Sequence, residues 1–146
     1  MKKILSLVVM ALIAIQFTSA KDVVTKDEMQ LPLAARNFIN QHFTKPQISY
    51  IKIESELFKG KKYEAVLTSG VEIEFDSKGE WTDVDCKRGA VPTSIVPEYI
   101  KEYVKANFNG QTITQIERDR YGIEVELAND LNLKFDKKGQ LRELDD

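Results

Sequence analysis

Apolar and polar residues alternate along two separate stretches of the chain, and both stretches follow the same order. Residues 71–85 read VEIEFDSKGEWTDVD and residues 131–145 read LNLKFDKKGQLRELD. Each has alternating apolar positions, a Phe-Asp pair, a Lys-Gly pair and then two apolar residues three positions apart. Alternation with a period of two is typical of a strand with one buried face. Each stretch therefore predicts a strand, a turn and a second strand.

Residues 31–43 and residues 96–108 also resemble each other, but with the spacing of a helix. The first reads LPLAARNFINQHF and the second reads VPEYIKEYVKANF, at an offset of 65 positions. Matched apolar residues recur every three or four positions, which predicts the buried face of an amphipathic helix. The early proline in each is tolerated in a first helical turn, where its missing N–H has no partner to lose. Each half of the chain thus begins with a helix of about three turns.

Further apolar residues predict two more strands between each helix and each alternating stretch. Residues 48–51 match residues 113–116 at the same offset, whereas YEAVLTSGVEIEF from residue 63 matches IEVELANDLNLKF from residue 123. The offset falls to 60 there, so the first half has five extra residues, which lie in the Gly- and Lys-rich stretch 56–62. That composition predicts a long hairpin loop. Each half is therefore read as a helix followed by four antiparallel strands.

Asp76 and Asp136 open the turns of the two alternating stretches. An aspartate at this position accepts hydrogen bonds from nearby backbone N–H groups, and Gly79 or Gly139 accepts the positive φ of the turn. Metal ligation is the alternative, but one carboxylate per loop falls far short of a calcium-binding loop. After each turn, two apolar residues three positions apart break the alternation, which predicts a β-bulge in both halves.

The first twenty residues predict a secretory signal peptide. Two lysines precede the apolar run 4–15, and small residues at 18–20 allow cleavage after Ala20. An uncleaved membrane anchor is the alternative, but a spanning helix needs about 20 apolar residues. No cysteine follows the cleavage site, so a lipid anchor is not expected. We expect a periplasmic or secreted protein with no stable membrane insertion after cleavage.

These patterns divide the chain into a signal peptide and two similar halves. A half of about 55 residues buries too little surface to be stable alone, so the halves are expected to share a core or join their sheets. The predicted fold is α+β, with two tandem α-β-β-β-β repeats, helices packed on one face of antiparallel sheet and the opposite face open. The segments are a signal peptide (1–20), an N-terminal leader (21–30), a first repeat (31–86), a linker (87–94) and a second repeat (95–146).

Charge and residue content exclude several classes of function. The formal net charge is −2 for the full chain, and it becomes about −4 when the two lysines of the signal peptide are removed. This argues against nucleic acid and against an anionic membrane surface as partners. Cys86 is the single cysteine, so no intrachain disulfide forms, and burial is favoured over pairing with a second chain.

No catalytic or metal-binding motif is found in the sequence. His42 is the single histidine, and one histidine with one cysteine cannot supply the three or four ligands of a zinc site. His42 is expected at the end of the first helix, where a positive charge would balance the helix dipole. The sequence displays no set of nucleophile, base and orienting group. We therefore predict no catalytic residue, no metal site, no cofactor and no enzymatic activity.

The helix and strand motifs together resemble a known family. The segments that carry the resemblance are YEAVL (63–67), EIEFDSKGEW (72–81), IEVEL (123–127) and LKFDKKGQL (133–141). They resemble the PepSY-like family of secreted Bacteroidetes proteins, although Leu141 stands where the first half has Trp81. The resemblance implies a fold similar to the beta-lactamase inhibitory protein, with a broad concave surface. It also implies kinship with PepSY domains, some of which lie in peptidase propeptides.

Candidate binding residues lie on the outward side of the predicted strands and in the long loop. If the apolar residues of 71–75 face the helix, Glu72 and Glu74 face solvent together with Glu64. Asp83 or Asp85 joins them, depending on whether the last strand is bulged. This surface is either an ordinary solvated face or a site for a cationic partner, such as a basic protein segment or loosely held Ca²⁺.

Aromatic residues are the second group of candidates, because they concentrate binding energy at interfaces. Phe58 lies in the lysine-rich loop, with no obvious core to join. Trp81 is the other candidate, although a core position is the favoured reading for it because leucine replaces it in the other half.

Together these features predict an exported, non-enzymatic protein-binding module, inhibitor-like toward a peptidase or another hydrolase. The alternative is a periplasmic protein that binds or senses a small ligand or cation, either Ca²⁺ or a cationic peptide. The expected partner is a periplasmic or surface protein whose identity the sequence leaves open, as it does the oligomeric state.

Overall fold

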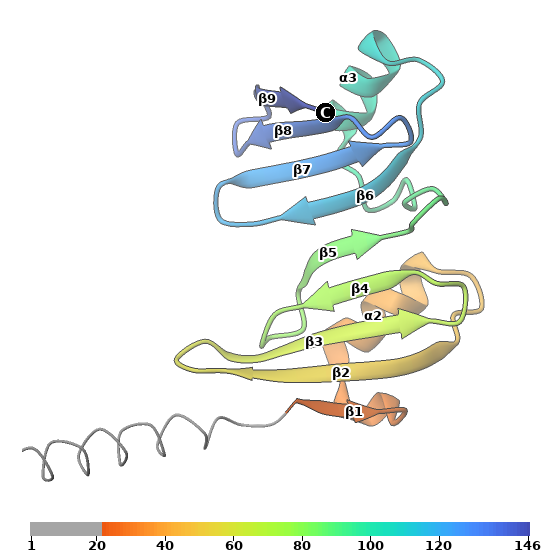
Figure 1. Cartoon of the computed structure of the whole chain (residues 1–146), viewed down its shortest axis with the longest axis vertical. Helices are drawn as coiled ribbons and strands as arrows, with labels where there is room; N and C mark the ends of the chain where they lie inside the picture. Colours follow the sequence, from red (N-terminus) through yellow and green to blue (C-terminus); the bar gives the residue numbers. More distant parts are fainter. Residues whose placement is uncertain (1–21) are drawn as a thin grey trace, which may run out of the picture.

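Nine strands form one antiparallel sheet in which every strand pairs with the next one in the chain. The computed structural model describes residues 22–146, so the predicted signal peptide lies outside the described residues. The α+β class is confirmed, and the sheet continues unbroken through the middle of the chain (Figure 1). The strands are β1 (Val23–Thr25), β2 (Ile48–Glu56), β3 (Gly60–Leu67), β4 (Glu72–Phe75), β5 (Trp81–Asp85), β6 (Ile113–Arg118), β7 (Gly122–Leu127), β8 (Asn132–Asp136) and β9 (Leu141–Asp145).

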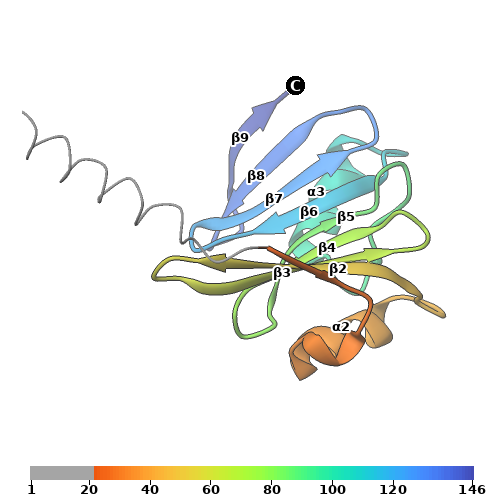
Figure 2. The same cartoon turned by 60° about the horizontal axis from the view of Figure 1, so that its bottom comes forward.

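Two helices, α2 (Leu33–His42) and α3 (Glu98–Asn107), cover the same face of the sheet (Figures 1 and 2). Each is ten residues long and is followed by four strands in chain order. The two prolines expected in the first turns, Pro32 and Pro97, stand one position earlier, as the N-caps. The extended backbone that proline favours outside the helix suits a cap, whose φ and ψ are not yet helical. No helix in residues 22–146 has the length and apolar character needed to cross a membrane.

The hydrophobic core lies between the helices and the sheet. Ala35 and Ile39 of α2, and Ile100 and Val104 of α3, supply the buried helix positions at the predicted spacing. Apolar residues at alternate positions of β2 to β8 meet them. The strand residues with no more than 1% of their surface exposed are Ile51, Ala65, Ile73, Phe75, Val84, Ile116, Val125, Leu127, Leu133 and Phe135.

The predicted turns and bulges are present in both halves. The Oδ1 atom of Asp76 accepts hydrogen bonds from the N–H groups of Lys78 and Glu80, and Asp136 makes the same pair of bonds in its own turn. The glycine of each turn has a φ near +80°. The register shifts between Glu74 and Phe75 where β4 pairs with β5, and it shifts at the matching point between β8 and β9. The turn interpretation of both aspartates is confirmed.

The stretch 22–30, which the sequence suggested as a leader, has regular structure of its own. β1 pairs with β2, with Val24 opposite Lys52. A short 3₁₀ helix, η1 (Glu28–Gln30), follows, capped by the side chain of Asp27. Three residues are too few to show a period, which is why β1 was not predicted.

Candidate functional site

Acidic side chains cross the open face of the sheet in a single row. The strand register places Glu64 opposite Glu74, Glu74 opposite Asp83, Asp83 opposite Glu117 and Glu117 opposite Glu124. We call these five carboxylates, which lie on β3 to β7, the acidic row. Residues directly opposite each other in antiparallel strands have Cβ atoms about 4.5–5.5 Å apart. Each member of the acidic row therefore has a like charge directly opposite it on at least one neighbouring strand.

Lysines flank the acidic row at both ends, and another lysine neutralises part of its charge. Lys52 lies beyond one end, on β2, and Lys134 lies beyond the other end, on β8. Within the row, the Nζ atom of Lys62 lies 2.9 Å from an Oε of Glu74. The other four carboxylates have no lysine or arginine nitrogen within 4.0 Å in the described part of the chain. The acidic row therefore keeps most of its negative charge.

Glu72, the remaining acidic candidate, lies beside the acidic row rather than in it. It pairs opposite Asp85 of β5. The Nζ atom of Lys87 binds both carboxylates, at 2.7 Å from Glu72 and 2.6 Å from Asp85. The structure therefore brings Glu64, Glu74 and Asp83 together, and it places Glu72 next to them with a lysine partner already bound.

Burial and like charge raise the pKa of three members of the acidic row. For Glu64, burial is the largest cause, and the carboxylates of Glu72 and Glu74 add to it. Burial also leads for Asp83 and Glu117, again with contributions from nearby carboxylates. The side-chain amide of Gln115 on β6 donates two hydrogen bonds of 3.0 Å to the Asp83 carboxylate, and these bonds oppose the rise of its pKa. These three carboxyl groups ionise less readily than usual, so a bound cation would stabilise their charged forms.

Replacing Glu117 by glutamine is expected to stabilise the protein at pH 7. The folded-state pKa of Glu117 is raised, so its contribution favours the folded state at low pH and is lost as pH rises through that pKa. Opposed like charges on a partly exposed sheet face cost about 0.5–1 kcal/mol after solvent screening. The midpoint of thermal unfolding should rise by about 2–4 °C at pH 7, and the gain should fade near pH 4, where the wild-type carboxyl is protonated.

Glu143→Gln is the matched control for this substitution. Glu143 lies on β9 opposite Lys134, so its removal relieves no repulsion and should give no gain at pH 7. Thermal scans of the two variants at both pH values make the comparison. A midpoint for Glu117→Gln at or below the wild-type value at pH 7 would show that the acidic row is not under strain.

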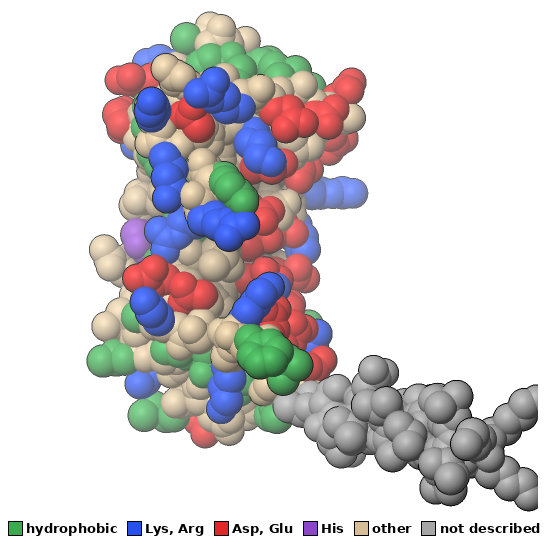
Figure 3. All heavy atoms as spheres, turned by 90° about the vertical axis from the view of Figure 1, so that its left-hand side faces the viewer, with side chains coloured by type: hydrophobic (Ala, Val, Ile, Leu, Met, Phe, Trp, Pro, Cys, Tyr) green, Lys and Arg blue, Asp and Glu red, His purple; other side chains and the backbone are tan. Residues whose placement is uncertain are grey.

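Phe58 stands at the tip of the β2–β3 hairpin and is almost entirely in solvent. Its side chain is 97% exposed and that of Leu57 is 82% exposed. The φ of Phe58 is +69°, a region that is uncommon for residues other than glycine. Figure 3 shows acidic side chains along one side of the molecule, with an exposed hydrophobic cluster beside them. We call residues Leu57 and Phe58 the hairpin tip.

Trp81 lies on the helix side of the sheet, away from the acidic row. Its ring stacks on Phe38 of α2 with centroids 6.1 Å apart. The guanidinium group of Arg118 lies 4.2 Å from the ring centroid and donates a hydrogen bond to the backbone carbonyl of Trp81. Trp81 packs against the core while remaining partly exposed, so it does not join the other candidates on the open face.

Cys86 and His42 line the same hollow on the helix side, but their surroundings do not favour nucleophilic chemistry. Burial raises the pKa of the Cys86 thiol to about 11, and the carboxylate of Asp85 adds to the shift. The thiol is therefore protonated near neutral pH, whereas the thiolate is the reactive form. The Nδ1 atom of His42 lies 2.8 Å from the Oγ of Ser94. Within residues 22–146, no three His, Cys, Asp or Glu side chains are placed to hold a metal ion.

Glu117 and Glu124 are the two members of the acidic row that were not among the candidate residues. Glu117 joins the row because β5 pairs with β6 across the middle of the chain, and Glu124 lies opposite it on β7. The alternation of residues 113–118 places Glu117 on an outward position, but only the pairing of the two halves shows which residue faces it. That pairing joins segments far apart in the sequence, so no local pattern indicates it.

The molecule is a small α+β protein. Two helices cover one face of its single antiparallel sheet, and the other face is open and acidic. The chain belongs to the PepSY-like family, which is described as "Putative beta-lactamase-inhibitor-like, PepSY-like" and whose sequence profile matches residues 61–143. The resemblance found in the sequence is confirmed. A search of curated proteins finds no significant match to the chain.

Three solved structures with a similar fold come from Bacteroides species and are described as putative periplasmic proteins. One, from Bacteroides vulgatus, is described as a "putative periplasmic protein of unknown function". It is 46% identical, with 86% of this chain and 100% of that chain covered and a TM-score of 0.83. Another, from Bacteroides thetaiotaomicron, is described as a "putative calcium-regulated periplasmic protein". It is 40% identical, with 86% and 97% covered and a TM-score of 0.81. A third, also from Bacteroides vulgatus, is described as a "putative periplasmic protein". It is 38% identical, with 86% and 98% covered and a TM-score of 0.81.

Proposed function

We propose that this protein is an exported, non-enzymatic binding module whose open sheet face binds a basic segment of another protein. The acidic row carries this proposal. Five carboxylates lie in register across β3 to β7, and four of them have no cationic partner within 4.0 Å among residues 22–146. A surface of one charge sign speeds the encounter with a partner of the opposite sign and selects against partners of the same sign.

The hairpin tip supplies the second contact of the proposed surface. An exposed phenylalanine offers a large apolar area to a pocket on the partner, and aromatic anchors are frequent among the residues that dominate binding energy. Phe58 stands on the strand pair that begins the acidic row, because β3 carries Glu64. A partner with a basic strip next to an apolar pocket would engage both features at once.

The partner class is a periplasmic hydrolase, such as a peptidase, that the binding module restrains. The description of the family as beta-lactamase-inhibitor-like supports a restraining role, although it does not indicate which hydrolase is bound. The periplasmic relatives support the same compartment. Export through the predicted signal peptide, with cleavage after Ala20, belongs to the same proposal.

The proposal also treats residues 31–86 and 95–146 as tandem copies of one unit. Both helices have ten residues and begin 65 positions apart, and four antiparallel strands follow each helix. Under this arrangement the acidic row crosses from the first copy into the second, so a partner bound there contacts both.

Affinity capture from periplasmic extract tests the proposed surface. Mature chain 21–146 is immobilised beside the variant Glu64→Lys/Glu117→Lys. A protein captured by the wild type should be recovered about tenfold less on this variant, because opposed like charges across an interface cost several kcal/mol. Glu98→Lys/Glu102→Lys is the matched control, since it reverses two exposed charges on α3. Equal capture by all three baits would remove the acidic row from the proposal.

A second candidate function is the binding of Ca²⁺ by the acidic row. The raised pKa values of three carboxylates favour it, and one relative is described as calcium-regulated. The spacing of one carboxylate per strand fits a loosely held ion better than a closed coordination site. Under this candidate, millimolar Ca²⁺ raises the thermal midpoint of the wild type more than that of Glu117→Gln, and Mg²⁺ has a smaller effect on both.

A further inference from the structure

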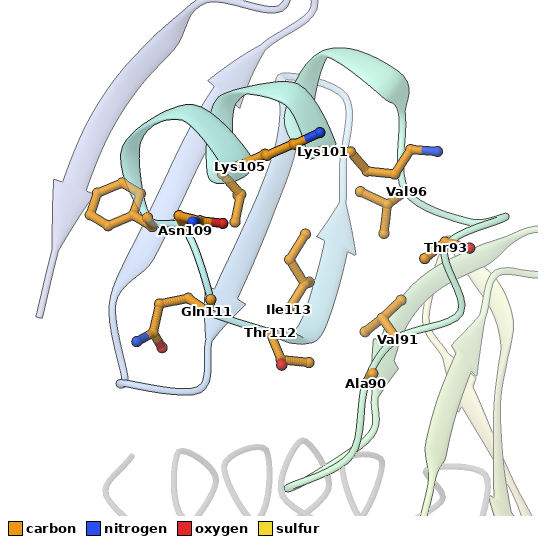
Figure 4. A pocket seen from close by; sticks show the side chains of 13 residues that line it. Ala90, Val91, Thr93, Val96, Lys101, Lys105, Asn109, Gln111, Thr112 and Ile113 are labelled. Carbon is orange, nitrogen blue, oxygen red and sulfur yellow. The ribbon is translucent and has the colours of Figure 1, made fainter.

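A pocket lies between α3, the segment that precedes it and the start of β6. Its volume is about 280 Å³. Figure 4 shows Lys101 and Lys105 on the helix side of the pocket, with apolar side chains on the facing walls. The size lies near the lower end of pockets that hold small ligands. The apolar side chains that line it are Ala90, Val91, Val96, Val104, Phe108 and Ile113.

The corresponding place in the first half of the chain is filled. Six residues there surround a space of only about 10 Å³. Each of the six stands 65 positions before a residue that lines the pocket under α3, the same offset that relates the two helices. The residues of the filled place are Glu28, Arg36, Ile39, Asn40, Pro46 and Ile48, and their counterparts are Thr93, Lys101, Val104, Lys105, Gln111 and Ile113.

The segment before each helix is bound to a different partner in the two halves. Before α2, the Sδ of Met29 accepts a hydrogen bond of 3.1 Å from Arg36, so η1 is held to its own helix. The counterpart of Met29 is Ser94, which lies 2.8 Å from the Nδ1 of His42 and is therefore tied to the other helix. The segment that contains Ser94 is therefore bound to α2 rather than to α3. The side of α3 that contains Val104 faces an open pocket.

The charges around the two places also differ. Glu28 supplies a carboxylate to the filled place, whereas its counterpart Thr93 is neutral. Asn40 is neutral, whereas its counterpart Lys105 is a cation with no acidic group within 4.0 Å among residues 22–146. Lys101 does have a partner, since its Nζ lies 2.8 Å from a carboxylate oxygen of α3. Compared with the filled place, the pocket under α3 therefore has one carboxylate fewer and one cationic side chain more.

We propose that the pocket under α3 binds a small apolar carboxylate, whose carboxyl group pairs with Lys105 and whose hydrocarbon part lies against Val96, Val104 and Ile113. The ligand would supply the negative charge that Glu28 supplies in the first half. Such a carboxylate belongs either to a free medium-chain fatty acid or to the C-terminal residue of a peptide. This site lies on the helix side of the sheet, so it is separate from the acidic row.

An NMR titration of ¹⁵N-labelled mature chain tests the proposal. The probes are octanoate, octan-1-ol and octylamine, which share a hydrocarbon part and differ in charge. Octanoate should shift the amide signals of residues 90–96 and 108–113 and should bind about fivefold more tightly than the alcohol, the effect of one partly exposed ion pair. N-acetyl-leucyl-leucine and its C-terminal amide form a second pair of probes, and the tighter of the two carboxylates identifies the source of the ligand.

Two substitutions that install the first-half residues sharpen the test. Thr93→Glu and Lys105→Asn should each weaken octanoate binding about fivefold while leaving octan-1-ol binding unchanged. Both positions are exposed, and the NMR spectrum reports whether each variant is folded. Lys137→Asn, in the β8–β9 turn, removes a lysine elsewhere and should have no effect. Equal affinity for octanoate and octan-1-ol, shifts centred outside the pocket, or no shifts at millimolar octanoate would each overturn the proposal.

Discussion

Replacing Gly122 by alanine is expected to lower the free energy of unfolding by about 3 kcal/mol or more and the thermal midpoint by about 10 °C or more. An added Cβ would overlap the backbone carbonyl oxygen of Phe135 and would lie 2.9 Å from its carbonyl carbon and 3.0 Å from the Cα of Asp136. All three atoms belong to the backbone of β8, which pairs with β7 at this point. The strand cannot move aside without breaking that pairing.

Gly70→Ala is the matched control for this substitution. Gly70 has a φ of +93°, and an added Cβ there meets no atom within 4 Å. The control therefore carries only the strain of a positive φ, which is about 1 kcal/mol. Denaturant unfolding of both variants gives the two free energies. Equal losses would show that crowding by β8 does not set the cost at Gly122.

Local patterns predicted the strands, helices and turns well, because each depends on neighbours in the chain. The alternation around Ile73 and the spacing of Ala35 and Ile39 are visible within single segments, and all three residues are buried as expected. The turn at Asp76 depends on its own side chain and a glycine three residues later. Physical causes that act over fewer than ten residues can be read from the sequence.

The bulge in β5 explains why Trp81 and Asp83 lie on opposite faces of the sheet. The two residues have the same parity, so strict alternation would place both on one face. The register shift between Glu74 and Phe75 inserts one extra residue, which turns Trp81 toward α2 while Asp83 stays on the open face. The sequence predicted the bulge and favoured a core position for Trp81, but it left open whether Asp83 or Asp85 joins the outward face.

Two features required the folded chain. The pairing of β5 with β6 joins the halves and completes the acidic row at Glu117. The segment beside the pocket under α3 is bound to the other helix through the contact of Ser94 with His42, about fifty residues away. Both are contacts between distant segments, and neither has a signature in local spacing. The acidic row and the pocket under α3 both involve contacts between the two halves, so they are harder to predict than the elements themselves.

Replacing Phe75 by alanine is expected to cost about 3–5 kcal/mol of the free energy of unfolding. Phe75 is fully buried, and its ring meets that of Phe38 edge-on with centroids 5.8 Å apart. Phe38 also stacks on Trp81, so the cavity left by Phe75 would remove support from both aromatic rings. Tryptophan fluorescence during denaturant unfolding measures the loss and should also report a changed environment of Trp81 before unfolding.

Phe58→Ala makes the same chemical change at the hairpin tip and should cost less than about 0.5 kcal/mol. Because its ring is 97% exposed, it has almost no packing to lose. The contrast matters for function, since a stable Phe58→Ala variant allows a loss of partner capture to be attributed to a lost contact rather than to unfolding. A cost above about 2 kcal/mol would place the ring against the protein in solution. The hairpin tip would then be part of the fold, and the acidic row alone would carry the proposed interaction.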